Sequence, residues 1–168
     1  MSLFLFVFLF SCTREEITEQ VVNTTYVQAP EYLYEVETLS LQQSGIDKPN
    51  QKTLNEFASI AYSDLFDETI AQDKLSDLLS TYAAFGDKIL VEELIIRNFL
   101  NQSGLVIPSE TEMNNNVDLF IEETYKKLFN RNPNEFEAWK LKDLIENNDI
   151  GPEVVYFSFM TSEEYRYY

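Results

Sequence analysis

Histidine is missing from this 168-residue sequence, and cysteine occurs once, at Cys12. Without histidine the chain lacks His-based catalytic triads, histidine metal ligands and the usual proton shuttle near neutral pH. A single cysteine permits no disulfide within the chain, and it provides no thiol nucleophile if it carries lipid, as argued below. We therefore expect no metal site, no cofactor and no enzymatic activity.

Glycine, proline and basic residues are also scarce. The 4 Gly and 5 Pro argue against a turn-rich β-sandwich or barrel. Lys and Arg number 12 against 29 Asp and Glu, for a net charge of −17. Binding to nucleic acid depends on cations that neutralise phosphates, so nucleic acid is not an expected partner. The same charge repels anionic lipid surfaces, whereas 13 Phe and 10 Tyr supply apolar area for a core.

The longest apolar run lies at the N-terminus and is short. Residues 3–10 read LFLFVFLF and stop at Ser11-Cys12. Spanning a bilayer core takes about twenty apolar residues, so this run fits the apolar stretch of a signal peptide rather than a membrane helix. It begins almost at Met1 without a preceding Lys or Arg, which leaves open whether Met1 is the true start. A buried N-terminal strand or helix beside a chance cysteine is the alternative.

Residues 9–12, Leu-Phe-Ser-Cys, resemble a bacterial lipobox, in which a Leu and a small residue precede the cysteine that is acylated. The resemblance implies a signal peptide over residues 1–11 and a lipid anchor on Cys12, which places the protein in the bacterial cell envelope at the outer membrane. Thr-Arg-Glu-Glu at 13–16 resembles the signal that sends lipoproteins of Bacteroidota-type bacteria to the outer face of that membrane. A solvated acidic linker explains these four residues equally well.

Residues 12–51 are polar and predict an extended tether, whereas apolar residues recur at helical spacing from Lys52 onward. The apolar faces comprise Leu54, Phe57, Ala58, Ala61, Tyr62 and Leu65; Leu75, Leu78, Leu79 and Tyr82; Leu90, Val91, Leu94, Ile95 and Phe99; Val117, Phe120, Ile121, Thr124, Tyr125 and Leu128; and Phe136, Trp139, Leu141 and Leu144. A capping box is expected at Ser109 and Glu112. We predict an all-α fold for residues 52–168, a compact bundle of about six helices.

One pattern occurs twice in the helical region. Phe57-x4-Tyr62-x2-Leu65-Phe66 recurs 63 residues later as Phe120-x4-Tyr125-x2-Leu128-Phe129, and Glu93-x5-Phe99 recurs 60 residues later as Glu153-x5-Phe159. Chance matching at helical spacing is the alternative to a duplication. We interpret the pattern as two degenerate three-helix units, residues 52–103 and 109–168. On this interpretation the apolar run 154–160, which by composition could form a buried strand, is a helix.

The second unit extends the pattern to Arg131-x-Pro133-x3-Glu137 and ends in Ser162-Glu163-Glu164-Tyr165-Arg166. Over about residues 117–167 it resembles a small helical module of a bacterial domain family of unknown function and, more distantly, of phycobilisome linker domains. The resemblance implies an all-helical module associated with surface-layer, secreted or assembly proteins rather than with defined chemistry. Asn130 stands where the family has Gly, and residues 67–70 of the first unit lack both the Arg and the Pro.

Arg131 is the one cation of this pattern for which we predict a structural role. We expect it to neutralise a buried carboxylate or carbonyl at the helix junction, with Glu137 and Glu164 as candidate partners. A contact between Arg131 and a ligand is the alternative.

Three functions remain open at this point. The first is a non-catalytic interaction or assembly module with an envelope protein as partner, whose contact surface would be Tyr156, Tyr165, Tyr167 and Tyr168, since Tyr is favoured at interfaces. A half-buried helix end is the alternative for these tyrosines. The second is a glycan- or peptide-binding lipoprotein in nutrient capture, in which Trp139 stacks on a sugar, although we expect Trp139 in the core beside Phe136. The third is a carboxylate-based hydrolase, which requires two acids facing one cleft.

Overall fold

The computed structural model describes residues 50–148 and 150–167, and this part of the chain is all-α, as predicted. Its six longer helices are α2 (Leu54–Phe66), α3 (Gln72–Tyr82), α4 (Lys88–Leu100), α6 (Val117–Phe129), α7 (Glu135–Asn148) and α8 (Pro152–Met160). Two short helices, α5 (Glu110–Asn115) and α9 (Glu163–Arg166), were not among the six expected. The predicted signal peptide, the lipidation site Cys12, the tether up to residue 49 and Tyr168 lie outside the described residues.

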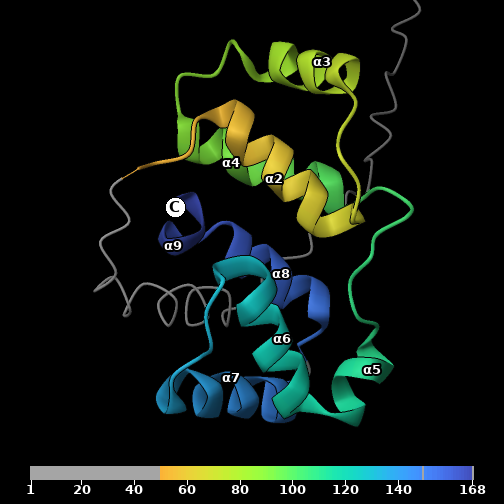
Figure 1. Ribbon diagram of the computed structural model, residues 1–168, viewed down its shortest axis with the longest axis vertical. Coiled ribbons are helices and arrows are strands. Elements are labelled where there is room, and N and C mark those ends of the chain that lie inside the picture. Colours follow the sequence, from red (N-terminus) through yellow and green to blue (C-terminus); the bar gives the residue numbers. More distant parts are fainter. Residues whose placement is uncertain (1–49, 149, 168) are drawn as a thin grey trace, which may run out of the picture.

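The two halves of the domain are stacked end to end. Figure 1 shows α3 at one end of the molecule and α7 at the other, with the α2–α4 pair and the α6–α8 pair between them. Helix α4 packs against α8 and joins the halves. The apolar run 154–160 lies in α8 and is helical, as the repeat predicted, with Pro152 at the first helical turn, where its missing N–H costs no hydrogen bond.

Helices α2 and α6 end in the same way. Each has 13 residues, and each is followed by a non-glycine residue in the left-handed region, Asp67 with φ 51° and Asn130 with φ 57°. The amide of each cap donates to a carbonyl four residues earlier, Ser63 and Lys126 respectively. This conformation ends a helix and turns the chain toward the next one.

Each half also contains a cluster of three aromatic rings. Phe99 of α4 lies 5.4 Å from Tyr62 and 6.2 Å from Phe66 of α2, measured between ring centroids. In the second half Phe159 of α8 lies 4.9 Å from both rings of α6, those of Tyr125 and Phe129. The two clusters use the residues paired by the sequence pattern, so the repeat extends to the packing of the core.

The C-terminal segment fastens the second half to the first. The backbone amide of Lys52 donates to the Arg166 carbonyl at 2.9 Å, and Arg166 Nε lies 2.8 Å from Glu92 Oε2 of α4. The Tyr165 hydroxyl donates to Asp64 of α2 at 2.6 Å. Glu92 and Arg166 are both buried, so their ion pair compensates charges that solvent does not reach.

The prediction that Phe136 and Trp139 belong to the core is wrong. Their exposed fractions are 52% and 61%, whereas Leu141, Leu144 and Ile145 are buried. The buried residues fall at i, i+3 and i+4 and define the inner face of α7. At about 100° per residue, Trp139 lies about 160° around the helix from Leu141, so it faces outward.

Candidate functional site

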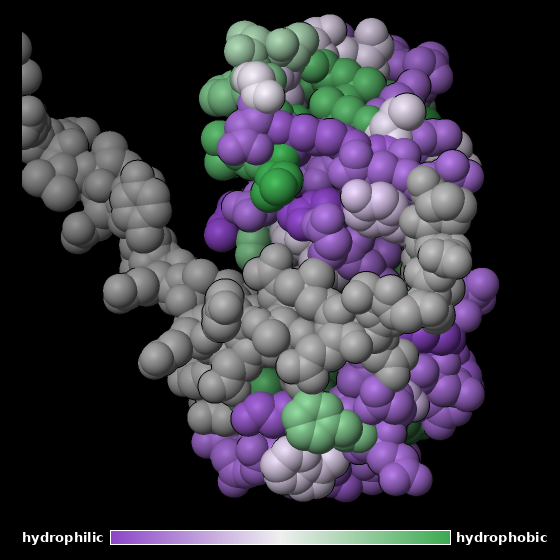
Figure 2. Space-filling view, turned by 90° about the vertical axis from the view of Figure 1, so that its left-hand side faces the viewer, coloured by the Kyte–Doolittle hydropathy of each residue, from purple (hydrophilic) through white to green (hydrophobic). Residues whose placement is uncertain are grey.

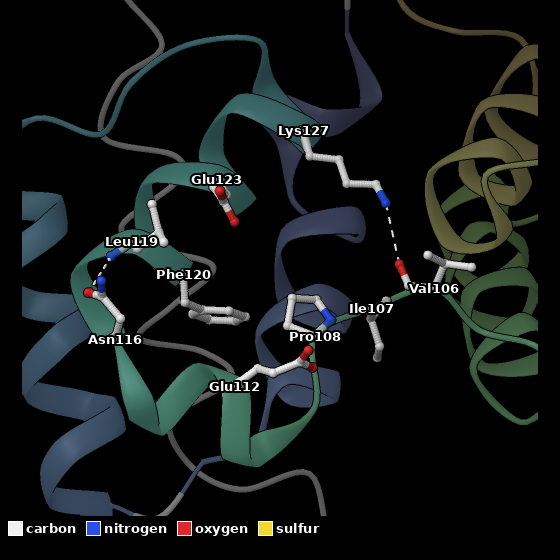
Figure 3. Close-up of a pocket in the computed structure, with 9 residues that line it drawn as sticks. All are labelled: Val106, Ile107, Pro108, Glu112, Asn116, Leu119, Phe120, Glu123 and Lys127. Carbon is white, nitrogen blue, oxygen red and sulfur yellow. Dashed lines mark hydrogen bonds between the residues drawn. The ribbon is translucent and has the colours of Figure 1, made fainter.

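A pocket of about 440 Å³ opens between the connector 105–108 and helices α5 and α6. Figure 3 shows Val106, Ile107 and Pro108 on the connector side, facing Phe120 and Glu123 of α6 across the pocket. The remaining lining residues are Glu112, Asn116, Leu119 and Lys127. A volume of this size is typical of ligand pockets in proteins.

Hydrogen bonds hold both walls of this pocket in place. The predicted capping box is present at the start of α5, where the Ser109 amide donates to the Glu112 carboxylate at 2.8 Å and the Glu112 amide donates to Ser109 Oγ at 3.3 Å. On the connector side, the Val106 amide donates to the Leu65 carbonyl at the end of α2 at 2.7 Å. The connector is therefore attached to the first half while α5 and α6 belong to the second.

The apolar lining is only partly covered. Phe120 is buried, but Val106 and Leu119 each keep an exposed fraction of 47%. Leu119, Glu123 and Lys127 follow one another at four-residue spacing, so they form a row along α6 beside its buried face. Leu119 is the sequence signal for this pocket, because it is a large apolar residue that falls outside the predicted core face.

The charge of the pocket is negative. Hydrogen bonds from the backbone amide and the hydroxyl of Ser109 lower the pKa of the Glu112 carboxyl, which keeps it ionised. Glu123 adds a second exposed carboxylate. Lys127, the one cation among the described lining residues, already pairs with Asp67, with Nζ 3.1 Å from Oδ1, and also donates to the Val106 carbonyl. A cationic group beside an apolar one would complement this lining.

Arg131 receives the two partners that the sequence named for it. Its NH1 and NH2 atoms donate to the Glu137 carboxylate at 2.8 Å each, and Nε and NH2 donate to Glu164 at 2.7 and 2.8 Å. The guanidinium carbon also lies 5.0 Å from the centroid of the Tyr125 ring. Burial alone would lower the pKa of Arg131, but the hydrogen bonds that it donates to both carboxylates outweigh this effect and raise its pKa above the usual value. This arrangement is a structural ion-pair triad joining α7 and α9 to the end of α6.

The predicted tyrosine surface does not exist in the form proposed. Tyr156 and Tyr165 are buried, Tyr167 is partly exposed, and Tyr168 lies outside the described residues. The Tyr165 hydroxyl donates a hydrogen bond to Asp64. Burial raises the pKa of both buried phenols, and it raises that of Tyr156 to about 12. These side chains belong to the joint between the two halves because α9 folds back onto α2.

Within residues 50–148 and 150–167, no three His, Cys, Asp or Glu side chains gather closely enough to hold a metal ion. In the same ranges, no helix combines the length and the apolarity that crossing a bilayer requires.

No protein-family model matches the chain, and comparison with curated proteins and with solved structures gives no match.

Proposed function

We propose that this protein is a lipid-anchored, non-catalytic component of the bacterial cell envelope that holds a partner protein in the pocket beside α5 and α6. The observation that carries the proposal is the combination of half-exposed Leu119 and Val106 with the carboxylates of Glu112 and Glu123 in one pocket. The partner segment presents an apolar side chain next to a Lys or Arg.

Each part of the lining has a role in this binding. An apolar side chain of the partner removes Leu119 and Val106 from water, which is the main source of affinity at about 25 cal/mol per Å² of buried apolar area. The neighbouring cation of the partner pairs with the two carboxylates and selects against acidic segments. With a net charge of −17 for the whole chain, approach of a basic partner is also favoured at long range.

The lipobox-like residues 9–12 support the anchoring part of the proposal. A chain this acidic gains nothing from an anionic lipid surface, so attachment must come from acyl chains on Cys12. The segment between Cys12 and Lys52 then serves as a spacer between the bilayer and the helical domain.

The pocket also contains the two acids that a carboxylate-based hydrolase would need. A glycosidase of this kind uses one carboxyl as a general acid, and burial raises its pKa so that it carries a proton near neutral pH. Glu112 is exposed and its pKa is lowered instead, which argues against that role. Release of reducing ends from a polysaccharide by the wild-type protein, but not by Glu123→Gln, would contradict the non-catalytic proposal.

Site-specific photo-crosslinking in the native envelope tests the proposed function. A benzophenone amino acid replaces Leu119 in the full-length, lipidated protein, and in a matched control it replaces Leu90 of α4, whose exposed fraction of 42% is similar. We expect the Leu119 probe to capture one envelope protein through a segment with an apolar residue beside Lys or Arg, and the Leu90 probe not to capture it. Identical captures from both positions, or none from Leu119, would contradict the proposal.

A fractionation control accompanies this experiment. Cys12→Ala should leave the membrane fraction, because the acyl chains are the proposed anchor. Unchanged membrane association of this variant would overturn the proposed lipid anchor. The proposed binding of a partner in the pocket would still be decided by the crosslinking experiment.

A further inference from the structure

Phe136 and Trp139 form an exposed aromatic pair on the outer face of α7. Their ring centroids lie 6.0 Å apart, with an angle of 38° between the ring planes. Figure 2 shows a group of less hydrophilic side chains near the end of the molecule where α7 lies in Figure 1, with hydrophilic surface beside and below it. Exposed apolar side chains that lie together, unlike those scattered singly, are candidates for a contact surface.

The helical unit itself does not need this pair. Helices α3 and α7 begin 63 residues apart, at Gln72 and Glu135, which is the spacing of the repeat. At that spacing the first unit has Asp73 and Ser76 where the second has Phe136 and Trp139. The three longer helices follow in the same order in both units, so this order does not require aromatic residues at the two positions.

The helix beneath the pair is rigidly attached. Leu141 and Leu144 are buried, and the Glu137 side chain of α7 is held by Arg131 at 2.8 Å. The two rings are therefore presented by a firm support, which reduces the ordering cost of binding a ligand to them.

The charges around the rings disfavour an anionic occupant. Glu135 and Asp143 lie four residues before and after Trp139, on the same side of the helix, and Lys140 lies four residues after Phe136. Lys142 is already paired with Asp118 at 2.8 Å. Among the described residues two carboxylates and one ammonium lie beside the rings, so the patch is net negative like the molecule as a whole, and its carboxylates can accept hydrogen bonds from a neutral ligand rich in hydroxyl groups.

We propose that Phe136 and Trp139 are a stacking platform for a neutral glycan, with one sugar ring on each aromatic ring. The C–H face of a pyranose is apolar and electropositive, and it packs against the electronegative face of an aromatic ring. Sugar hydroxyls at the edge donate to the carboxylates of Glu135 and Asp143. This site is separate from the pocket beside α5 and α6 and does not depend on it.

Two other occupants fit the patch less well. Helices that lie in a membrane interface are rich in Lys and Arg, whereas this side of α7 carries two carboxylates and the chain a charge of −17. A second copy of the chain would need about 1,000 Å² of buried surface for a stable interface, which two half-exposed side chains do not supply.

The test uses the intrinsic fluorescence of the full-length protein in detergent, because Trp139 is the single Trp of the chain. The probes are a panel of neutral hexasaccharides of glucose, mannose and N-acetylglucosamine, an anionic oligogalacturonate, and neutral and anionic lipid vesicles. We expect at least one neutral hexasaccharide to produce a saturable change, and neither oligogalacturonate nor vesicles to do so. Calorimetry should then show roughly tenfold weaker binding for Phe136→Ala and no binding for Trp139→Ala.

Two control variants complete the design. Phe85→Ala removes an aromatic ring of similar exposure at the other half and should bind like the wild type, and Trp139→Phe should retain part of the affinity. Circular dichroism establishes that each variant is folded. No saturable change with any neutral glycan, equal binding by Trp139→Ala, or a response to vesicles or oligogalacturonate alone would overturn the proposal.

Discussion

Asp67 and Asn130 occupy the same place in the two halves of the molecule. They lie 63 residues apart, each follows a 13-residue helix, and their φ angles of 51° and 57° differ by only a few degrees. Asp and Asn tolerate this left-handed conformation better than other non-glycine residues, because their short polar side chains hydrogen-bond locally. The conformation is therefore part of the repeated unit and not an accident of one loop.

Substitution of Asn130 tests this reading of the helix end. Asn130→Ala should lower the free energy of unfolding by about 1–2 kcal/mol, because a Cβ without a polar group is strained in the left-handed region. Asn130→Gly should be at least as stable as the wild type, because glycine adopts the conformation without strain. Urea unfolding followed by circular dichroism measures both variants. An alanine variant as stable as the glycine variant would show that the turn is not under this constraint.

Arg131 should be among the most sensitive residues of the domain. Arg131→Ala leaves Glu137 buried and Glu164 largely buried without their common cation, and breaking a buried pair on one side costs about 3–5 kcal/mol. Arg131→Lys should recover only part of the loss, since an ammonium cannot form two bidentate pairs at once. The matched control is Arg97→Ala, which removes an exposed arginine stacked on Phe157 and should cost below about 1 kcal/mol. Equal effects of the two alanine variants in urea unfolding would contradict a structural role for the triad.

The burial of Asp64 makes stability depend on pH in an unusual direction for a carboxyl group. Burial raises the pKa of Asp64 above the usual value of 3.8, although the hydrogen bond from Tyr165 and the charge of Lys52 lower it. A raised pKa means that the folded protein binds the proton more tightly than the unfolded chain. The stabilising contribution of this group is therefore complete below 3.8 and is lost as pH rises through the raised pKa.

Asp64→Asn isolates that contribution, because the amide oxygen still accepts from Tyr165 but does not titrate. As the pH is lowered from neutral toward 3.8, the free energy of unfolding of the wild type should improve relative to Asp64→Asn. Tyr165→Phe removes a hydrogen bond that lowers the pKa, so it should shift this change to higher pH. Denaturation curves at a series of pH values provide the measurement, and a constant difference between wild type and Asp64→Asn would contradict the assignment.

Much of the fold followed from local patterns. The helical spacing of Phe57, Ala58, Ala61 and Leu65 predicted α2, and the corresponding residues of α6 are equally buried. The spacing also indicated that 154–160 is a helix, because Phe159 had to match Phe99. Arg131 and its partners were predictable because an arginine in an acidic domain usually pairs with a carboxylate inside the domain.

The parts that sequence reasoning missed depend on contacts between distant segments. On α7, Leu141 and Leu144 were correctly assigned to the core. Trp139 was wrongly assigned with them, because the prediction gave more weight to its apolar side chain than to its angular position on the helix. Tyr165 was predicted at the surface because nothing local indicates that α9 returns to Asp64, about a hundred residues earlier in the chain. The pocket at Leu119 was missed for the same reason, since one of its walls is the connector 105–108.

The central claim is that the acidic pocket holds a basic partner segment. It is tested most directly by two single variants, one that reverses the charge of Glu123 and one that reverses the charge of the adjacent Glu122. Glu123 lines the pocket, whereas Glu122 pairs with Lys126 outside it, so Glu123→Lys and Glu122→Lys change the net charge of the chain equally. The measurement is the amount of the crosslinked envelope partner that co-purifies with each full-length, lipidated variant. The account predicts that Glu123→Lys reduces recovery at least about tenfold while Glu122→Lys recovers the partner like the wild type. Equal recovery with both variants, or an equal loss with both, would contradict it.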